Sequence, residues 1–334
     1  MNAFTQNAQQ NAAQSAKNMN KGLWLGLVGV TLFAATLPMT KLAVGSVDAP
    51  QLSPWFVTFG RAAVAGLLSI VYLLWQYSRR LEPNLPAELA WKTPTLRECG
   101  LLAFTASAVV LGFPLFMSLA LQYVPSTHGA VVTGLLPLAT AVIAALWFRQ
   151  QPSLGFWACA VLGTALVLGF MVVRSLDSAG HVSLLDSVMK ADVFLIIAML
   201  WGAFGYIGGA RLTPSLGAER VICWVLVLSL PFTLPLSWFN QPVDATLIRA
   251  SSWWGFAYVA VFSMWLGFFA WYRGLALGGA VRVSQVQLVQ PFLSLLFAVP
   301  LLGETIDATT LGFGLAVIAT VFVGKKMPVG ISKL

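Results

Sequence analysis

The segment GFWACAVLGTALVLGFMVV, residues 155–173, runs for 19 residues without a charged side chain. A helix of about twenty apolar residues can cross the hydrocarbon core of a bilayer. A strand of a transmembrane β-barrel would instead alternate apolar and polar residues over about ten positions. Ten such apolar blocks occur in the chain: Gly22–Val44, Ser53–Tyr77, Cys99–Tyr123, Ser126–Phe148, Gly155–Val173, Asp192–Leu212, Glu219–Trp238, Trp253–Leu277, Ala280–Leu302 and Thr309–Gly324. We therefore predict an all-α integral membrane protein with ten transmembrane helices.

The composition excludes most classes of soluble protein. Of the 334 residues, 58% are hydrophobic and only 9% are charged, whereas about a quarter of a soluble protein is charged. The net charge is +8, but the basic residues lie in short loops beside apolar blocks, so we expect no nucleic-acid partner. The three cysteines show no CxxC spacing and no Gly-rich phosphate loop occurs, so we expect no metal site, cofactor or nucleotide.

The two ends of the chain are more polar than the blocks. Residues 1–21 are rich in Gln, Asn, Ala and Ser, a composition typical of disorder, so we predict a disordered tail there. The block Gly22–Val44 is longer than the apolar region of a signal peptide and lacks a small-x-small cleavage site, so we expect it to remain as a span. Residues 325–334 are predicted to form a second, short tail.

The lysines and arginines predict the orientation. On alternating sides of ten spans, fourteen of the 19 basic residues fall on the side of the N-terminus. Only Lys41, Arg174, Lys190 and Arg249 fall on the opposite side, and Arg61 lies inside a span. Because cytoplasmic loops carry the excess of Lys and Arg, we expect both tails to be cytoplasmic.

The two halves of the chain resemble each other. The LPL motif around Pro137 matches the QPF motif around Pro291 at an offset of 154, and LGF at 111–113 matches LGF at 266–268 at an offset of 155. We therefore predict two repeats of five spans, residues 22–173 and 192–324. Because five is odd, the second repeat enters the bilayer in the opposite sense, which is the inverted architecture of many secondary transporters with a midplane site.

An ordered set of motifs resembles the drug/metabolite transporter superfamily, specifically its ten-span EamA-type members. The motifs are FAATLPMTK at 33–41, FGRAA at 59–63, ALQYVPSTHGA at 120–130, LPL at 136–138, WG at 201–202, GLAL at 274–277, QP at 290–291 and LGE at 302–304. The family often has Trp in place of Phe33 and Glu in place of Gln150. The resemblance implies a multi-pass carrier of the cell inner (cytoplasmic) membrane for amino acids, other metabolites or drugs, often an exporter.

Polar side chains in the fourth and ninth blocks are candidates for the substrate pathway. Ser284, Gln287 and Pro291 share one helical face at spacings of three and four, and Thr133 is central in the fourth block. A buried amide in a bilayer requires a partner or a water-lined cavity, but Gln and Ser also join helices structurally. Pro137 and Pro291 each free a carbonyl one turn earlier and are expected to kink their helices.

Two titratable or charged groups are further candidates. Arg61 has a planar fork that suits a carboxylate or phosphate on the cargo, although it could instead snorkel outward or tie helices together. His128 begins the fourth block and has an ordinary pKa near neutrality, although a single histidine there is more often a cap or packing partner.

Aromatic residues could line a cavity that stacks on the cargo. Trp265 and Tyr272 share one face of the eighth block, and Trp201 and Phe116 could join them. Lipid contact is the alternative for most of these rings. Gln122, inside the third motif, completes the set of pathway candidates.

No Asp or Glu lies in the middle of any block, which disfavours proton-driven antiport of cations. We expect transport of a small metabolite, such as an amino acid, by alternating access rather than catalysis. A multidrug efflux carrier is one alternative, and an intramembrane enzyme or a non-transporting receptor is another of a different class. The expected partners are a small-molecule substrate and membrane lipid, in a monomeric or homodimeric protein.

Overall fold

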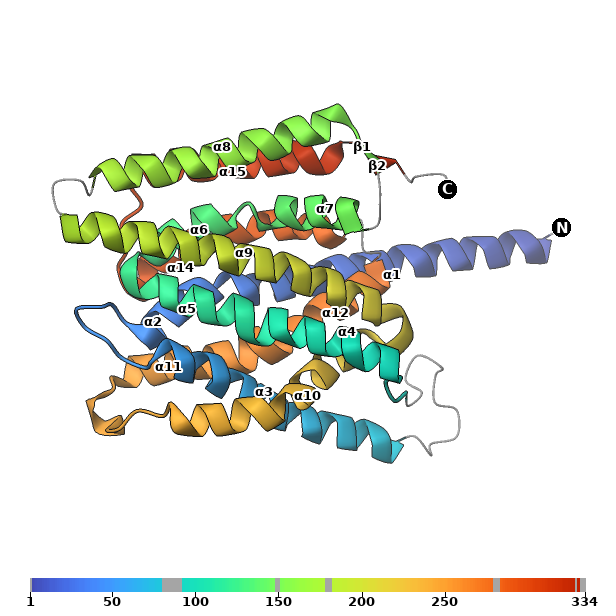
Figure 1. Cartoon of the computed structure of the whole chain (residues 1–334). Coiled ribbons are helices and arrows are strands. Elements are labelled where there is room, and N and C mark those ends of the chain that lie inside the picture. The colour runs from blue at the N-terminus through green and yellow to red at the C-terminus, as the bar shows by residue number, and fades with distance from the viewer. Residues whose placement is uncertain are drawn as a thin grey trace.

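The computed structural model of the protein describes residues 2–79, 92–147, 151–177, 182–278, 283–327 and 329–330. Helices with roughly aligned axes form a bundle, and the start of α1 extends beyond it (Figure 1). The elements in chain order are α1 (Asn2–Ala34), α2 (Thr36–Val44), α3 (Pro54–Ser78), α4 (Leu96–Ala106), η3 (Ser107–Gly112), α5 (Phe113–Tyr123), α6 (Ser126–Thr133), α7 (Leu136–Trp147), β1 (Gln151–Pro152), α8 (Leu154–Asp177), α9 (Val182–Leu216), α10 (Ala218–Phe239), η4 (Ala245–Leu247), α11 (Ala250–Tyr258), η5 (Val259–Leu266), α12 (Gly267–Gly278), η6 (Ser284–Val289), α14 (Gln290–Leu302), α15 (Ala308–Lys326) and β2 (Val329–Gly330).

Seven helical segments of the described chain are long and apolar enough to cross a membrane. They are Lys17–Val44, Pro54–Ser78, Leu96–Tyr123, Leu154–Val173, Val188–Leu216, Ala218–Phe239 and Ala250–Gly274. Gln290–Leu302 and Ala308–Gly324 are shorter apolar helices, and the predicted block Ser126–Phe148 is divided between α6 and α7. The all-helical, multi-pass class is therefore confirmed, while the predicted count of ten spans is not.

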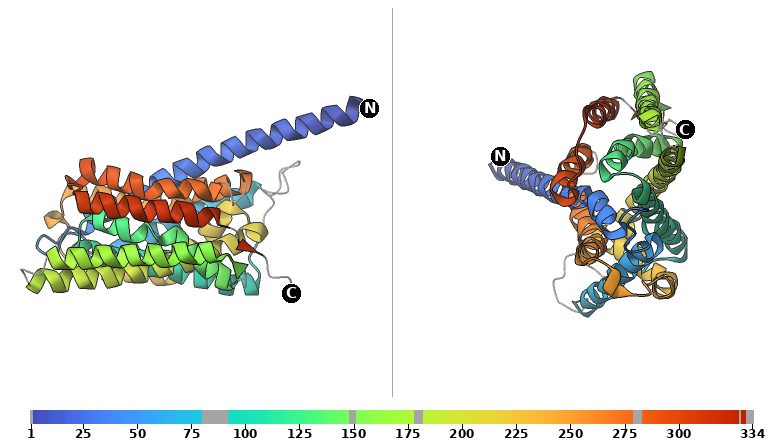
Figure 2. Two further views of the ribbon diagram at one scale, coloured as in Figure 1. Left: turned by 90° about the horizontal axis from the view of Figure 1, so that it is seen from above. Right: turned by 90° about the vertical axis from the view of Figure 1, so that its left-hand side faces the viewer.

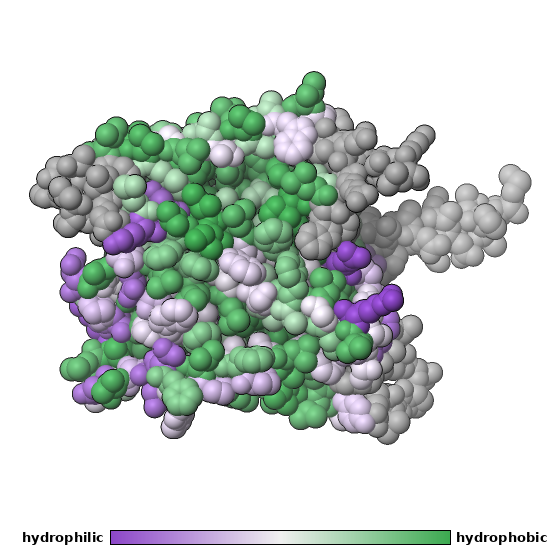
Figure 3. Space-filling model, viewed as in Figure 1, coloured by the Kyte–Doolittle hydropathy of each residue, from purple (hydrophilic) through white to green (hydrophobic). Residues whose placement is uncertain are grey.

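The lateral surface agrees with a membrane environment. Hydrophobic side chains cover most of the lateral face, and hydrophilic ones gather towards the two ends of the bundle (Figure 3). Exposed large apolar residues occur on successive turns of single helices, for example Leu67, Val71 and Leu74 on α3. In water such a surface would be an unfavourable apolar patch, whereas in lipid it is the expected outer face.

The N-terminal residues are helical from Asn2, because α1 is a single helix of 33 residues. This differs from the disordered tail predicted for residues 1–21, and the Ala and Gln residues there have high helix propensity. The helix projects from the bundle at the end where α15 finishes (Figure 2). At the same end β1 pairs antiparallel with β2, with Gln151 opposite Gly330.

The long helices are interrupted at matching places in the two halves. The π-helices η3 and η5 end at Gly112 and Leu266, which are 154 residues apart. Helices α7 and α14 begin 154 residues apart, and a proline, Pro137 or Pro291, is the second residue of each. A proline lacks the N–H that would continue the hydrogen-bond ladder from the preceding turn, so each helix starts anew at this point.

The helix pairing also follows the two halves. Helix α3 packs along α10, α6 against α14 and α8 against α15, while α1 packs on α12 and α5 on α9. This pairing is symmetric between the two halves. When each predicted block of one half is exchanged for the corresponding block of the other, the pairs α3–α10, α6–α14 and α8–α15 are unchanged, and the pair α1–α12 becomes α5–α9.

Two apolar clusters form the interior. One contains Leu37, Met117 and Leu136, and the other contains Phe33, Val109, Met264 and Phe268. Large buried side chains fill both clusters, as in close-packed protein interiors. The clusters meet near the middle of the bundle, which is where the candidate site lies.

Candidate functional site

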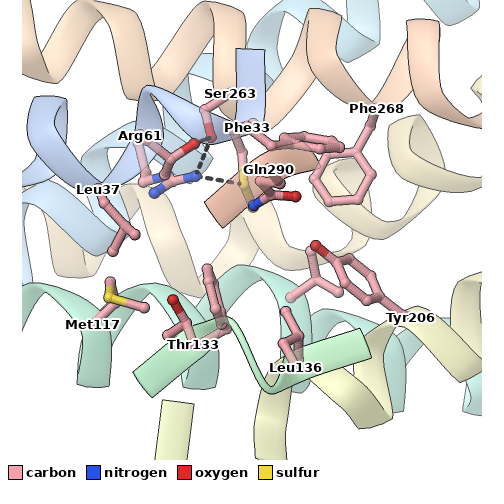
Figure 4. A pocket seen from close by; sticks show the side chains of 15 residues that line it. Phe33, Leu37, Arg61, Met117, Thr133, Leu136, Tyr206, Ser263, Phe268 and Gln290 are labelled. Atoms are coloured by element: carbon pink, nitrogen blue, oxygen red, sulfur yellow. Dashed lines mark hydrogen bonds between the residues drawn. The ribbon is translucent and has the colours of Figure 1, made fainter. Parts of the chain in front are cut away.

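A cavity of about 60 Å³, which we call the central cavity, lies where the two apolar clusters meet. Side chains from both halves of the chain line it: Phe33, Thr36, Leu37, Arg61, Val109, Phe113, Met117, Thr133, Leu136, Tyr206, Ser263, Met264, Phe268 and Gln290, together with the backbone of Gly202. Figure 4 shows Arg61 and Ser263 facing Thr133 and Leu136 across the cavity, with Tyr206 and Phe268 at one end. Most of this wall is apolar, and a few polar groups converge on it, as in many small-molecule sites.

Arg61 is the charged residue among the described lining residues. Its side chain comes from α3 and is only 3% exposed. The Nη2 group donates to Ser263 Oγ at 3.3 Å and to Met264 Sδ at 3.5 Å, whereas a guanidinium normally donates to a carboxylate at about 2.7–2.9 Å. No acceptor in the described part of the chain bonds to Arg61 Nε. The guanidinium is therefore buried with two contacts, both to neutral groups.

Ser263 joins three elements at the edge of the cavity. Its hydroxyl lies 2.8 Å from the Thr36 hydroxyl of α2 and accepts from Arg61 of α3. Ser263 and Met264 belong to the π-helix η5, and π segments inside α-helices frequently occur at functional sites. The π-helix η5 thus places both acceptors of Arg61 on the cavity wall.

The remaining polar groups come from α6, α9 and α14. Thr133 Oγ1 donates to the Gly129 carbonyl at 2.7 Å, and Tyr206 of α9 also lines the cavity. Gln290 lines both the central cavity and an adjacent void of about 20 Å³, which Gln287 and Pro291 also line. The interruptions before α7 and α14 therefore lie beside the cavity.

Aromatic rings form the apolar part of the wall. Phe33 and Phe268 meet edge to face with their ring centroids 5.0 Å apart, and Phe113 and Tyr206 also line the cavity. The family pattern often has Trp at the position of Phe33, and the smaller ring here still belongs to the wall.

Among the predicted pathway residues, Arg61, Thr133 and Gln287 line these two voids. The four predicted aromatics, Phe116, Trp201, Trp265 and Tyr272, are not among their described lining residues. Trp201 packs against the backbone of Gly112. Trp265 contacts Tyr72 and Phe269, outside the cavity. Tyr272 is buried behind Phe268, with ring centroids 5.5 Å apart.

The predicted shared face of Trp265 and Tyr272 rests on α-helical spacing, and the π turns of η5, which contains Trp265, change that spacing. Ser284 belongs to η6, but its side chain lies outside the described part of the structure.

A larger vestibule of about 760 Å³ lies at the end of the bundle where the segments 45–53 and 303–307 connect helices, which we call the vestibule end. Lys41, Gln122, Arg249 and Glu304 line it. Lys41 Nζ donates to the Leu121 carbonyl at 2.6 Å. Leu37 lines the cavity and Lys41 the vestibule, and four residues of helix rise about 6 Å. About one helical turn of α2 separates the two spaces.

The vestibule end also contains two strongly bonded acidic groups. The Glu304 carboxylate accepts from the backbone N–H groups of Ser126 and Thr127 at 2.7 and 2.9 Å, and so caps α6. His128 Nε2 lies 2.6 Å from Asp192 Oδ1, with both side chains buried. His128 also borders a recess of about 490 Å³ beside the vestibule. These bonds fix α6 to α9 and to the chain that follows α14.

Several residues of the site were missed from the sequence. Ser263, Thr36 and Tyr206 stood among many similar residues in apolar blocks, and their shared cavity depends on packing between distant segments. Asp192 was missed because acids were sought only in the middle of blocks, although it is 6% exposed. Asp192 and His128 each lie near the end of a predicted block, so a buried pair between them is a hypothesis that the sequence supports.

Comparison with known proteins places the chain among membrane transporters. The profile of the EamA-like transporter family matches residues 20–172 and 189–324. The "Uncharacterized transporter YdeK" of Bacillus subtilis (strain 168) is 39% identical over 304 residues, which cover 91% of this chain and 96% of that protein. The "Uncharacterized transporter YyaM" of the same organism is 23% identical, covering 80% and 81%. A protein of known crystal structure has the same fold, with a TM-score of 0.58, 15% identity and coverage of 92% and 98%.

Proposed function

Because this chain belongs to the EamA-like transporter family, we propose that it carries a small metabolite across the inner membrane by alternating access around the central cavity. The observation that carries the proposal is the cavity itself, which α2, α3 and α5 of one half and α9, η5 and α14 of the other half line together. A site between two halves suits a carrier, because rocking of one half against the other exposes the site to each side in turn.

Ten spans in two inverted five-span repeats are part of the proposal. The matched π-helices, the matched starts of α7 and α14, and the helix pairing that survives exchange of the halves all support it. The three blocks outside the seven full-length spans still cross the bundle, as α6 with α7, η6 with α14, and α15 (Figure 1).

We assign the vestibule end to the outer side of the membrane and both termini to the cytoplasm. The excess of Lys and Arg near the termini supports this orientation, and α1 begins at the end of the bundle where α15 finishes (Figure 2). Amino acids and related compounds are the proposed cargo and export the proposed direction, as the family resemblance implies.

The helix interruptions supply the moving parts in this mechanism. Helices α6 and α7, and η6 and α14, meet beside the cavity without continuous α-helical hydrogen bonding. Such joints absorb changes in backbone angles when helices tilt. A cargo in the cavity would leave outward when the turn of α2 between Leu37 and Lys41 moves away from its neighbours.

Purified protein in proteoliposomes tests the function. Counterflow of labelled amino acids, organic acids and a panel of drug-like amines is measured against empty liposomes. We expect saturable uptake of at least one metabolite and loss of most uptake in Thr133→Trp, which fills the cavity. Thr164→Trp, on an exposed face of α8, is the matched control and should retain uptake. Uptake of amines alone would favour the multidrug alternative, and no uptake of any compound would contradict transport.

A further inference from the structure

We propose that Arg61 makes the central cavity a binding site for an organic carboxylate, an inference that rests on the proposed transport function and names the substrate class. The starting point is the charge of the cavity. Arg61 is the one cation among the described lining residues, and none of those residues is acidic. A guanidinium stays protonated in proteins, so the cavity carries a positive charge without an anion beside it.

The hydrogen-bonding capacity of Arg61 is also largely unused. A guanidinium has five N–H donors, and the contacts at 3.3 and 3.5 Å to Ser263 and Met264 occupy one nitrogen. Nε is buried and has no acceptor in the described chain. A carboxylate could accept from Nε–H with one oxygen and from Nη2 with the other, in place of one of the two neutral contacts, and so use the planar edge of the guanidinium.

A purely structural role explains these contacts less well. Where the protein uses a charge to hold helices together, the bonds are short, as for Glu304 at 2.7 and 2.9 Å and His128 with Asp192 at 2.6 Å. The contacts of Arg61 reach only neutral groups, a hydroxyl at 3.3 Å and a thioether, which is a weak acceptor. The geometry therefore leaves room for a better acceptor from outside the chain.

The other residues that line the cavity indicate the chemistry of the rest of the bound molecule. Phe33, Phe113 and Phe268 present apolar rings, and the Tyr206 hydroxyl, the Gln290 amide and Thr133 supply neutral polar groups. An anion with an apolar or aromatic body satisfies both sides of the cavity. An amine would place a second cation beside Arg61 without an acidic partner, which is electrostatically unfavourable.

The test uses the full-length protein in nanodiscs and a matched set of probes. Benzoate and propionate are the carboxylates, benzamide and propionamide their neutral counterparts, benzylamine the cation and inorganic phosphate the alternative anion. Thermal unfolding is measured over a concentration series, because a ligand that binds the folded state raises its apparent stability. We expect the two carboxylates to raise the apparent Tm in a saturable way and the other four probes to leave it unchanged.

Variants assign the effect to Arg61. Arg61→Gln and Arg61→Met should abolish the carboxylate shift, and Arg61→Lys, which keeps the charge and loses the fork, should raise the half-saturating concentration at least tenfold. Arg220→Gln is the matched control, because Arg220 of α10 is similarly buried at 4% exposure but is not among the cavity-lining residues. It should keep the wild-type response.

A second measurement needs no ligand. If Arg61 is an unsatisfied binding group, Arg61→Met in the empty protein should unfold at a higher temperature than wild type, since replacing a buried charge by an apolar residue is often stabilising. If Arg61 is a structural tie, the Tm should fall, and the proposal is overturned. Equal shifts by amides and carboxylates, a shift by phosphate alone, or a carboxylate shift that survives in Arg61→Gln would also overturn it.

The same proteoliposome assay separates this inference from the proposed function. Saturable uptake of neutral or cationic metabolites without uptake of any carboxylate would leave the protein a transporter and remove the carboxylate assignment. Carboxylate binding without uptake of any compound would keep the site and contradict transport.

Discussion

Charged side chains are bonded differently at the vestibule end and in the central cavity. At the vestibule end, the Asp192 carboxylate lies 2.6 Å from His128, and the Glu304 carboxylate accepts two backbone N–H bonds. In the cavity, Arg61 contacts only a hydroxyl and a thioether, both of them neutral. Paired groups stabilise the fold, whereas an unsatisfied buried group persists where it serves a function. The comparison therefore separates residues that fix helices from Arg61, which we propose binds the cargo.

The largest expected effect is at Asp192. Replacement by Ala leaves His128 buried without its partner, and breaking such a pair costs about 3–5 kcal/mol. We expect a strongly lowered Tm and yield in detergent, measured by fluorescence-detected size exclusion with heating. Asp192→Asn keeps a hydrogen-bonding group and should lose about half as much or less. Asp48→Ala, at an exposed loop position, is the control, and a Tm for Asp192→Ala equal to that of this control would break the comparison.

Gly112→Ala tests the packing around the cavity. The added methyl group would collide with the indole of Trp201, and overpacking of this kind costs about 1–3 kcal/mol. Neighbouring Phe113 and Gly202 line the cavity, so we expect lower thermal stability together with altered substrate affinity in counterflow. Gly100→Ala in α4 meets no atom within 4 Å of its new methyl group and should be neutral or stabilising. An equal response of the two variants would show that the wall is not rigid at this point.

The smallest effect is expected at Glu304. Replacing it by Ala removes the cap of α6, and caps contribute about 0.5–2 kcal/mol. The residue is partly exposed, so solvent screening places the expected loss near the lower end, about 1 kcal/mol. Glu304→Gln keeps one acceptor oxygen and should fall between. Equal Tm values for the Ala variant and the wild type would indicate that the two N–H bonds do not stabilise α6.

Much of the fold follows from local sequence signals, and the site follows only in part. The apolar blocks and the prolines at 137 and 291 mark where helices run and where they are interrupted. Arg61 is recognisable because a charge inside a block is costly and therefore informative. Thr133 and Gln287 stand out as polar groups at central positions, and they line the voids.

The remaining features depend on tertiary structure. The faces of Trp265 and Tyr272 were assigned on regular α-helical spacing, but η5 is a π-helix and changes the register. The partnership of Ser263 with Thr36 joins residues 227 positions apart, which no local pattern specifies. The number of full-length spans depends on how long each helix remains once a block is interrupted, and the composition of a block does not predict that length.

The single turn of α2 between the cavity and the vestibule has an electrical consequence. A transmembrane voltage falls mainly across low-dielectric material. In the orientation that we propose, with the vestibule on the outer side, water filling the 760 Å³ vestibule would extend the outer potential almost to Leu37. An anion beside Arg61 would then lie at a short electrical distance from the outside. Its outward step would depend weakly on membrane voltage, and most of the field would act on its path from the cytoplasm.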